Sequence, residues 1–244
     1  RGVLQSTASF GLEMSDVTDE MARGEKLASL VGADSLDELR SMDARELLEV
    51  YTEHFDDHYH SPVIDHQLIP GPMWGRDFGD LELMVGTNRD EWLDSVGDVA
   101  SSHVEETAEK HPQIGGMEAL SWVAGETDPR RAMDRMVTAA EMVCPSQSIA
   151  AQRTASGGKA WMYWFTRQRE DAGGARVGVY HGAEYPYIFG VHDDYMTTTE
   201  YDRRLSALMQ RYWINFAATG DPNGYGLPEW PQFERPDPLV MELG

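Results

Sequence analysis

The sequence predicts an α/β fold with a mostly parallel sheet, on three observations. The apolar runs Leu81–Val85 and Ala160–Thr166 have the composition of buried strands, and the second contains four aromatic residues. Long segments with helical patterns separate the predicted strands. In the longest of these, Thr199–Thr219, apolar residues recur at spacings of three and four, which is typical of a helix with one buried face. Strands that alternate with helices indicate a parallel sheet.

The remaining elements follow from the same patterns. A short buried strand is predicted at Val3–Ser6 and a last strand in PLVMEL, residues 238–243. Further helices are predicted at Asp16–Val31, Leu36–Arg40, Ala44–His54, Arg130–Met142 and Ser146–Thr154, with Gly32 ending the first and Asp43 capping the third. Pro145 is expected to interrupt the helical run between the last two of these helices. Residues 168–179 are expected to form a loop.

Length and composition favour one globular domain over residues 1–244, since 41% hydrophobic residues suffice for a core. The 42 acidic and 20 basic residues give a formal net charge of −22. Such a charge repels nucleic-acid phosphates and anionic membrane surfaces, so we expect neither as a partner. A solvated acidic surface is the simplest interpretation, and a field that attracts cationic substrates is the alternative.

Cysteine usage leaves the compartment undecided. Cys144 is the only cysteine, so no disulfide can form within these residues. Its apolar neighbours favour a small buried thiol, and a bridge to another segment is the alternative. No apolar run approaches the length of about 18 residues that crosses a bilayer.

Two short segments carry candidate chemistry. GTNRDE, residues 86–91, follows a predicted strand, and loops after strands gather functional groups in α/β folds. HGAEYPYIFG, residues 181–190, begins with a histidine in a predicted turn. Taken alone, each has an ordinary interpretation. The first is then an acidic loop with a helix-capping carboxylate, and the second a surface or core histidine.

Together the two segments indicate catalysis. Glu91 precedes His181 by 90 residues (181 − 91), and an acid followed by a histidine is one chain order of the Ser–His–Asp/Glu triad. In such a triad the imidazole takes the proton of a serine hydroxyl. The carboxylate fixes the histidine tautomer and stabilises the imidazolium.

With these residues the chain resembles the type-B carboxylesterases and cholinesterases, over nearly all of its length. Five blocks occur in that family's order and rough spacing: RGVLQSTAS, SPVID, GTNRDE, HGAEYPYIFG, and YWINFAATGDPNG followed by WPQF. The resemblance implies an α/β-hydrolase fold, of which residues 1–244 would form the C-terminal portion, with a mostly parallel sheet flanked by helices. It implies no cofactor.

The resemblance also implies roles for individual residues. Glu91 occupies the position of the triad acid and His181 that of the general base. Glu184 matches a family carboxylate three residues after the histidine, which we expect to support the pair from behind. Other matches are expected in the core or in turns, namely Trp213, Asn215, Phe216, Gly220 and Trp230.

The segment EHFDDHYHSP, residues 53–62, precedes the family's P-V-x-D motif, and the residues there line the acyl pocket in that family. This places Asp56, His58 and His60 near bound substrate. A zinc site, with HxH on a strand, is the alternative interpretation, with candidate ligands His54, His58, His60, Glu53, Asp56 and Asp57. Their types and spacing fit no closed site, so a polar pocket wall is preferred and no metal ligand is assigned.

Two parts of the family's machinery are missing from the sequence. No serine has a glycine two residues away on both sides, as G-x-S-x-G requires. The glycine-rich loop that supplies oxyanion donors is also absent. We expect both on an N-terminal fragment or chain upstream of Arg1, arising by cleavage or as a separate subunit. That part would be the partner of this chain, which we expect to be inactive without it.

The sequence therefore predicts a carboxylic ester hydrolase acting by Ser–His–Glu covalent catalysis on a small-molecule ester, with Glu91 and His181 supplied by this chain. A catalytically inactive cholinesterase-like adhesion or binding module is the alternative, against which the retention of both residues argues. A lyase or acyltransferase with the same triad is a third hypothesis, because the fold does not distinguish these reactions.

Overall fold

The computed structural model describes residues 1–7, 14–55, 58, 60–71, 79–192 and 196–244. The chain forms two compact units. The first comprises Arg1–Phe10 and Asp77–Gly244, and the second comprises Gly11–Arg76.

A four-stranded parallel sheet organises the first unit. Its strands lie in the order β1-β2-β3-β4, with bounds Gly2–Gln5, Leu83–Asn88, Ala160–Phe165 and Met241–Leu243. The predicted α/β class with a parallel sheet is confirmed. Every residue of β2 is buried, because this strand lies between two others and both of its faces are covered.

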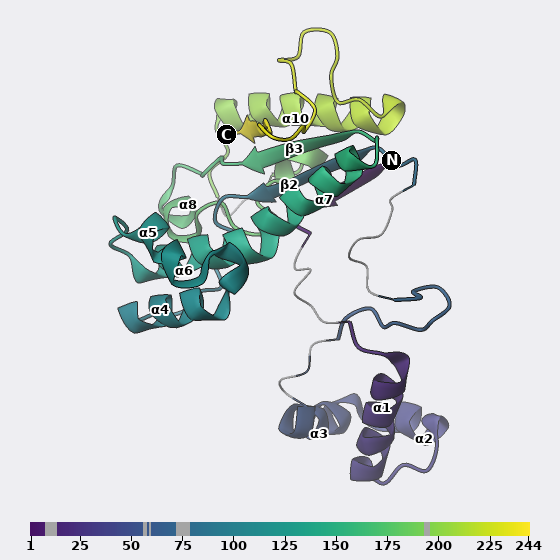
Figure 1. Cartoon of the computed structure of the whole chain (residues 1–244). Helices are drawn as coiled ribbons and strands as arrows, with labels where there is room; N and C mark the ends of the chain where they lie inside the picture. Colours follow the sequence, from purple (N-terminus) through teal and green to yellow (C-terminus); the bar gives the residue numbers. More distant parts are fainter. Residues whose placement is uncertain (8–13, 56–57, 59, 72–78, 193–195) are drawn as a thin grey trace. The chain divides into compact units, whose positions relative to one another are not determined.

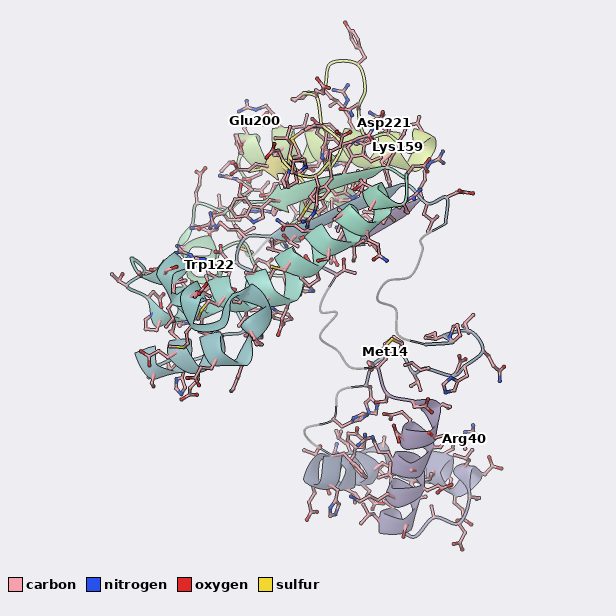
Figure 2. All side chains as sticks on the ribbon, in the orientation of Figure 1. Met14, Arg40, Trp122, Lys159, Glu200 and Asp221 are labelled. Atoms are coloured by element: carbon pink, nitrogen blue, oxygen red, sulfur yellow. The ribbon has the colours of Figure 1, made fainter. Side chains whose placement is uncertain are left out.

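Helices cover the two faces of this sheet (Figure 1). Alternate residues of β3 face opposite sides. Trp161 and Tyr163 pack in the cluster that contains the buried face of α10, Glu200–Thr219, whereas Ala160 and Met162 pack with α7, Cys144–Ala155. Figure 2 labels Glu200, the first residue of α10, and Asp221, which lies just beyond its end. The predicted long helix is thus confirmed, with Thr199 as its N-cap and Gly220 as its C-cap.

Several shorter helices complete the first unit: α4 Ser101–Lys110, η1 Pro112–Ile114, η2 Gly116–Ala119, α5 Leu120–Val123, α6 Pro129–Thr138, α8 Ala172–Val177 and α9 Tyr185–Phe189. The pattern did not predict α4, α5 or α8. Only two residues of α4, Val104 and Ala108, belong to a hydrophobic cluster, so an apolar stripe is hard to recognise there. Helix α8 corrects the loop expected at 168–179. None of the described helices has the length and apolar content that a membrane span requires.

The helical segment around Pro145 differs from the prediction. Helix α6 runs through the π-helical turn Ala139–Val143 (η3) directly into α7, in which Pro145 lies in the first turn. Within a continuous helix a proline removes one backbone hydrogen bond, and here the π-helical turn lies just before it. Pro145 therefore does not end the helical segment. The π turn, which contains one extra residue, ends directly before Cys144 and Pro145.

Two strand predictions also need correction. Strand β2 continues to Asn88, so three residues of GTNRDE belong to the strand and only the last three form the turn after it. Strand β1 is confirmed in place but is not buried, and Val3 is 38% exposed. In the described residues β1 pairs with β2 along one edge only. Cys144 is a free, half-buried thiol, and burial raises its pKa.

The second unit holds three helices, α1 Val17–Val31, α2 Leu36–Ser41 and α3 Ala44–Phe55. All three predicted helices are confirmed. Asp16 caps α1 by accepting from the amide of Thr18, and Gly32 ends it in the left-handed conformation, at φ 71°, that glycine adopts without strain. His58 and His60, after α3, have no regular secondary structure, so the HxH motif does not lie on a strand.

Candidate active site

Glu91 and His181 are in direct contact at the carboxyl end of the sheet. Nδ1 of His181 lies 2.8 Å from Oε2 of Glu91, and the backbone amide of His181 donates to the carbonyl of Glu91 at 3.0 Å. The Glu91 side chain is fully buried, whereas 43% of the imidazole is exposed. The backbone and side-chain bonds together fix which ring nitrogen faces the acid. Nε2 lies on the opposite side of the ring.

The contact with Glu91 also changes the pKa of His181. Its hydrogen bond to the carboxylate raises the pKa of His181 above the ordinary value, and partial burial acts in the opposite sense. A neutral His181 donates from Nδ1 to Glu91, which leaves Nε2 as a proton acceptor. The pair therefore has the arrangement that a general base requires.

The second oxygen of Glu91 is held from the other side. Oε1 accepts from Oγ of Ser6 and from the amide of Asn88, both at 2.6 Å. Ser6 follows directly after β1 and has a positive φ of 48°. Because each oxygen of the carboxylate has its own partners, the group cannot rotate away from His181 without losing buried hydrogen bonds.

The backbone on either side of Glu91 is anchored to α6. The amide of Glu91 donates to Oγ1 of Thr138, which in turn donates to Oδ1 of Asp134, each at 3.2 Å. The same Oδ1 accepts from the amide of Trp92 at 2.8 Å. Asp134 is fully buried, and its burial raises the pKa of its carboxyl to about 7. Helix α6 thus positions the turn that carries the acid.

Trp92 contacts the histidine directly. Its indole is stacked on the imidazole of His181, with ring centroids 5.6 Å apart and planes 3° apart. The ring of His181 is therefore held at Nδ1 by Glu91 and on one face by an aromatic plane.

Glu184 lies behind the pair and is fully buried. Its carboxylate accepts from Nδ2 of Asn88 at 2.5 Å and from Nε2 of Gln5 at 3.0 Å. Nδ2 of Asn88 also donates to the carbonyl of Tyr180, next to the histidine. Burial raises the pKa of Glu184. Glu184 makes no hydrogen bond to either ring nitrogen in the described structure. It is linked to the pair through Asn88, and its charge adds to the raised pKa of His181.

The neighbouring acid, Asp90, has a structural role. Its Oδ2 accepts from the guanidinium of Arg89 at 2.8 Å and from the amide of Val179 at 2.8 Å. These bonds tie the turn after β2 to the segment before His181. Asp90 thereby supports the position of the histidine without contacting it.

The structure brings together three of the predicted site residues, Glu91, His181 and Glu184, and their catalytic roles stay a prediction. His58 and His60 belong to the second unit, and their contact with substrate stays a prediction as well. Asp56 and Asp57 lie outside the described residues.

Sequence reasoning missed five residues of the site: Ser6, Asn88, Trp92, Asp134 and Thr138. A signal existed for the first two, because Ser6 and Asn88 end strands that would be neighbours in a parallel sheet. Asp134 and Thr138 had none. Within the described part of the chain, no serine, threonine or cysteine donates a hydrogen bond to His181.

Comparisons with known proteins identify the family of this chain. A sequence model described as the carboxylesterase family matches residues 1–244. Acetylcholinesterase 1 of Caenorhabditis briggsae is 31% identical over 147 residues, which is 56% of this chain and 23% of that protein. Phenmedipham hydrolase of Pseudarthrobacter oxydans is 27% identical over 266 residues, covering 100% of this chain and 54% of that protein.

Solved structures match the fold. The carboxylesterase of Geobacillus stearothermophilus superposes with a TM-score of 0.73 at 23% identity, covering 100% of this chain and 55% of that one. A PNB esterase superposes with a TM-score of 0.71 at 19% identity, covering 99% and 53%. The predicted α/β-hydrolase fold is therefore confirmed. This chain spans about half or less of the length of these relatives and structures.

Proposed function

The chain belongs to the carboxylesterase family, and from this premise we propose that it takes part in the hydrolysis of a carboxylic ester. Glu91 would be the acid and His181 the base of a Ser–His–Glu triad, and a further part of the protein would supply the serine. The observation that carries this proposal is the 2.8 Å contact between Nδ1 of His181 and the buried carboxylate of Glu91. Because Nδ1 makes this contact, Nε2, the other ring nitrogen, is not bonded to Glu91.

In the proposed reaction, Nε2 of His181 takes the proton of the serine hydroxyl as the serine oxygen attacks the ester carbonyl. The imidazolium that forms is stabilised by Glu91. When the tetrahedral intermediate collapses, His181 gives this proton to the leaving alcohol, and an acyl-serine remains. His181 then takes a proton from water as the water oxygen attacks the acyl-serine. When the second tetrahedral intermediate collapses, the bond to the serine oxygen breaks, His181 returns the proton to that oxygen, and the carboxylic acid is released. Both half-reactions need the same orientation of the imidazole, which Ser6, Glu91 and Trp92 support.

We also propose that the part with the serine docks at the open edge of β1. This strand has one paired edge among the described residues, and its backbone groups on the other edge are available for another strand. Val3 of β1 is exposed as well. A strand that leads to G-x-S-x-G and pairs there would bring the serine to the carboxyl ends of β1 and β2, where Glu91 lies.

The test compares residues 1–244 alone with the same residues combined with the part that carries G-x-S-x-G, in one polypeptide or as a complex. We expect ester hydrolysis and labelling by a fluorophosphonate only in the combined protein, and loss of both when the serine is replaced by alanine. A folded combined protein in which His181→Gln keeps full turnover would contradict the triad. A combined protein that binds esters without hydrolysing them would favour the inactive binding module.

A further inference from the structure

A second cluster of side chains, in the unit Gly11–Arg76, has the composition of a metal site. Glu20 of α1 lies beside His58 and His60, and one ligand atom of each lies within 4.8 Å of the other two. The interpretation from sequence paired these histidines with acids close to them in the chain, and those fit no closed site. The structure supplies instead a carboxylate from a helix 38 residues before His58 (58 − 20).

The distance between Nε2 of His58 and Oε2 of Glu20 fits two ligands of a metal ion better than a hydrogen bond. Nε2 of His58 lies 3.3 Å from Oε2 of Glu20, whereas a charge-assisted hydrogen bond between such groups measures about 2.7–2.9 Å. A tetrahedral zinc ion with bonds of about 2.0–2.2 Å holds neighbouring ligand atoms about 3.3–3.6 Å apart. The spacing of the pair therefore matches two ligands of one ion.

The hydrogen bonding of the cluster is incomplete in a way that an ion would complete. Nε2 of His58 and Oε1 of Glu20 are both buried, and neither has a hydrogen-bond partner among the described residues. A buried polar atom without a partner is destabilising, so such atoms are normally paired or bound to an ion or a water molecule. The unpaired acceptor atoms of Glu20 and His58 are the ones that an ion would contact. Nε of Arg23 and the hydroxyl of Tyr51, beside the cluster, also lack a hydrogen-bond partner among the described residues.

His60, the third residue of the cluster, is oriented by its neighbours. His60 stacks on Tyr51 of α3, with ring centroids 5.2 Å apart, and lies edge-on to His58 at 5.0 Å. His60 is the exposed member of the cluster. A metal held there would keep one side toward solvent, which suits a site with three protein ligands and a water molecule.

We propose that Glu20, His58 and His60 bind a zinc ion. Two imidazoles and one carboxylate favour zinc over Mg²⁺ and Ca²⁺, which prefer oxygen ligands alone. Binding would link α1 to the segment after α3. Arg23, whose Nε lies 3.5 Å from Oε2 of Glu20, opposes a second cation. Its side chain is 31% exposed and long enough to turn into solvent when the ion binds.

The experiment is a titration of chelator-treated chain 1–244 with Zn²⁺ by calorimetry. Stoichiometry of one and a thermal midpoint that rises with Zn²⁺ are expected. Each of Glu20→Gln, His58→Gln and His60→Gln should weaken binding at least about tenfold, because even changes to groups behind a ligand cost that much. Co²⁺ in place of Zn²⁺ should give the visible absorption of a tetrahedral site.

A matched control comes from the same unit. His66 contacts Asp16 through Nε2, so it forms a histidine–carboxylate pair of ordinary hydrogen-bonded kind. His66→Gln should leave the affinity for Zn²⁺ unchanged. Should one ligand variant fail to fold, the other two decide. The proposal is overturned if the folded chain binds no Zn²⁺ at micromolar concentration. It is equally overturned if the ligand variants bind as tightly as the wild type, which would locate the ion on the acidic surface.

Discussion

The indole of Trp92 and the imidazole of His181 lie parallel, 3° apart in plane and 5.6 Å apart in centroid. An aromatic face attracts a cation, so this arrangement favours the imidazolium over the neutral ring. It also restricts rotation about the side-chain bonds of His181, since the ring has little room to tilt. If His181 is the base, Trp92 would act as a positioning residue through this ring contact.

Replacing Trp92 by alanine should lower the pKa of His181. The loss of a partly exposed cation–aromatic contact is worth about 0.5–1 kcal/mol, which corresponds to about 0.4–0.7 pKa unit. NMR titration of the His181 ring in chain 1–244 measures this without the missing serine. Trp92→Phe should recover part of the shift, because a smaller aromatic face remains. An unchanged pKa in Trp92→Ala, with the fold intact, would show that the stacking has no electrostatic effect.

Replacing Glu91 by glutamine should have a larger effect. The amide cannot stabilise the imidazolium, so the pKa of His181 should fall and turnover of the completed enzyme should decrease about 10³–10⁴-fold. The fold should survive, since glutamine keeps one acceptor oxygen for Ser6 and Asn88. Asp94→Asn is the control. The charge of Asp94 also raises the pKa of His181, but less than the hydrogen bond to Glu91 does. Comparable losses in both variants would contradict the role of Glu91 as the acid.

The contact between Glu91 and His181 was predictable because chain order and motif both pointed to it. The sequence predicted that Ser6 lies at the end of a strand, but it did not predict the contact of Ser6 with Glu91. Ser6 follows β1 and Asn88 is the last residue of β2, which is the parallel neighbour of β1, but the sequence does not state the strand order. The anchoring by Asp134 was not predictable, because the sequence predicts the helix that carries Asp134 but not its position beside the turn after β2.

The same contrast separates the helices. The periodic pattern of α10 extends over its 20 residues and therefore predicts the helix closely. Helix α8 has six residues, two of them consecutive glycines, and is held by its cap Asp171, whose Oδ1 accepts from Gly174. Such a helix depends on tertiary contacts and capping, so local propensity does not reveal it.

Asp134 should make the stability of the first unit pH-dependent. Burial raises its pKa in the folded protein to about 7, above the usual value of 3.8 for an aspartate side chain. The proton is therefore bound more tightly in the folded state, and the stabilisation is fully present below pH 3.8 and is lost as pH rises through 7. The difference of about 3 pKa units sets an upper limit of about 4 kcal/mol on this loss.

Asp134→Asn is neutral throughout and should remove this contribution. Its free energy of unfolding should exceed that of the wild type above pH 7, since Oδ1 can still accept from the amide of Trp92. Urea denaturation at pH 5, 6, 7 and 8 and constant ionic strength measures the difference between the two proteins. Glu184 and His181 also titrate, but they do so in both proteins, and the difference isolates Asp134. Parallel stability profiles for the two proteins would mean that Asp134 does not titrate in this range.

The histidines of the second unit give the last prediction, which concerns substrate choice. If His58 and His60 line the acyl pocket, a plain alkyl acyl group would leave buried polar groups unpaired, at about 1–3 kcal/mol each. The completed enzyme should then have a higher kcat/KM for hydroxylated or carboxylated acyl esters than for short alkyl esters. His58→Phe should reverse this preference by about 10-fold or more, because one polar group at about 1.4 kcal/mol corresponds to a factor of ten.

Zinc bound at His58 and His60 would change the expected result of this substrate comparison. If Glu20, His58 and His60 hold zinc near the acyl group, removal of the metal should shift the acyl preference in the wild type and leave His58→Phe unaffected. A polar wall without metal would give the substitution effect and no effect of chelation. His66→Phe, at a histidine already paired with Asp16, controls for a change in the unit as a whole. A wild-type enzyme that prefers plain alkyl esters, and is unchanged by both His58→Phe and chelation, would remove these histidines from the pocket while leaving the triad proposal intact.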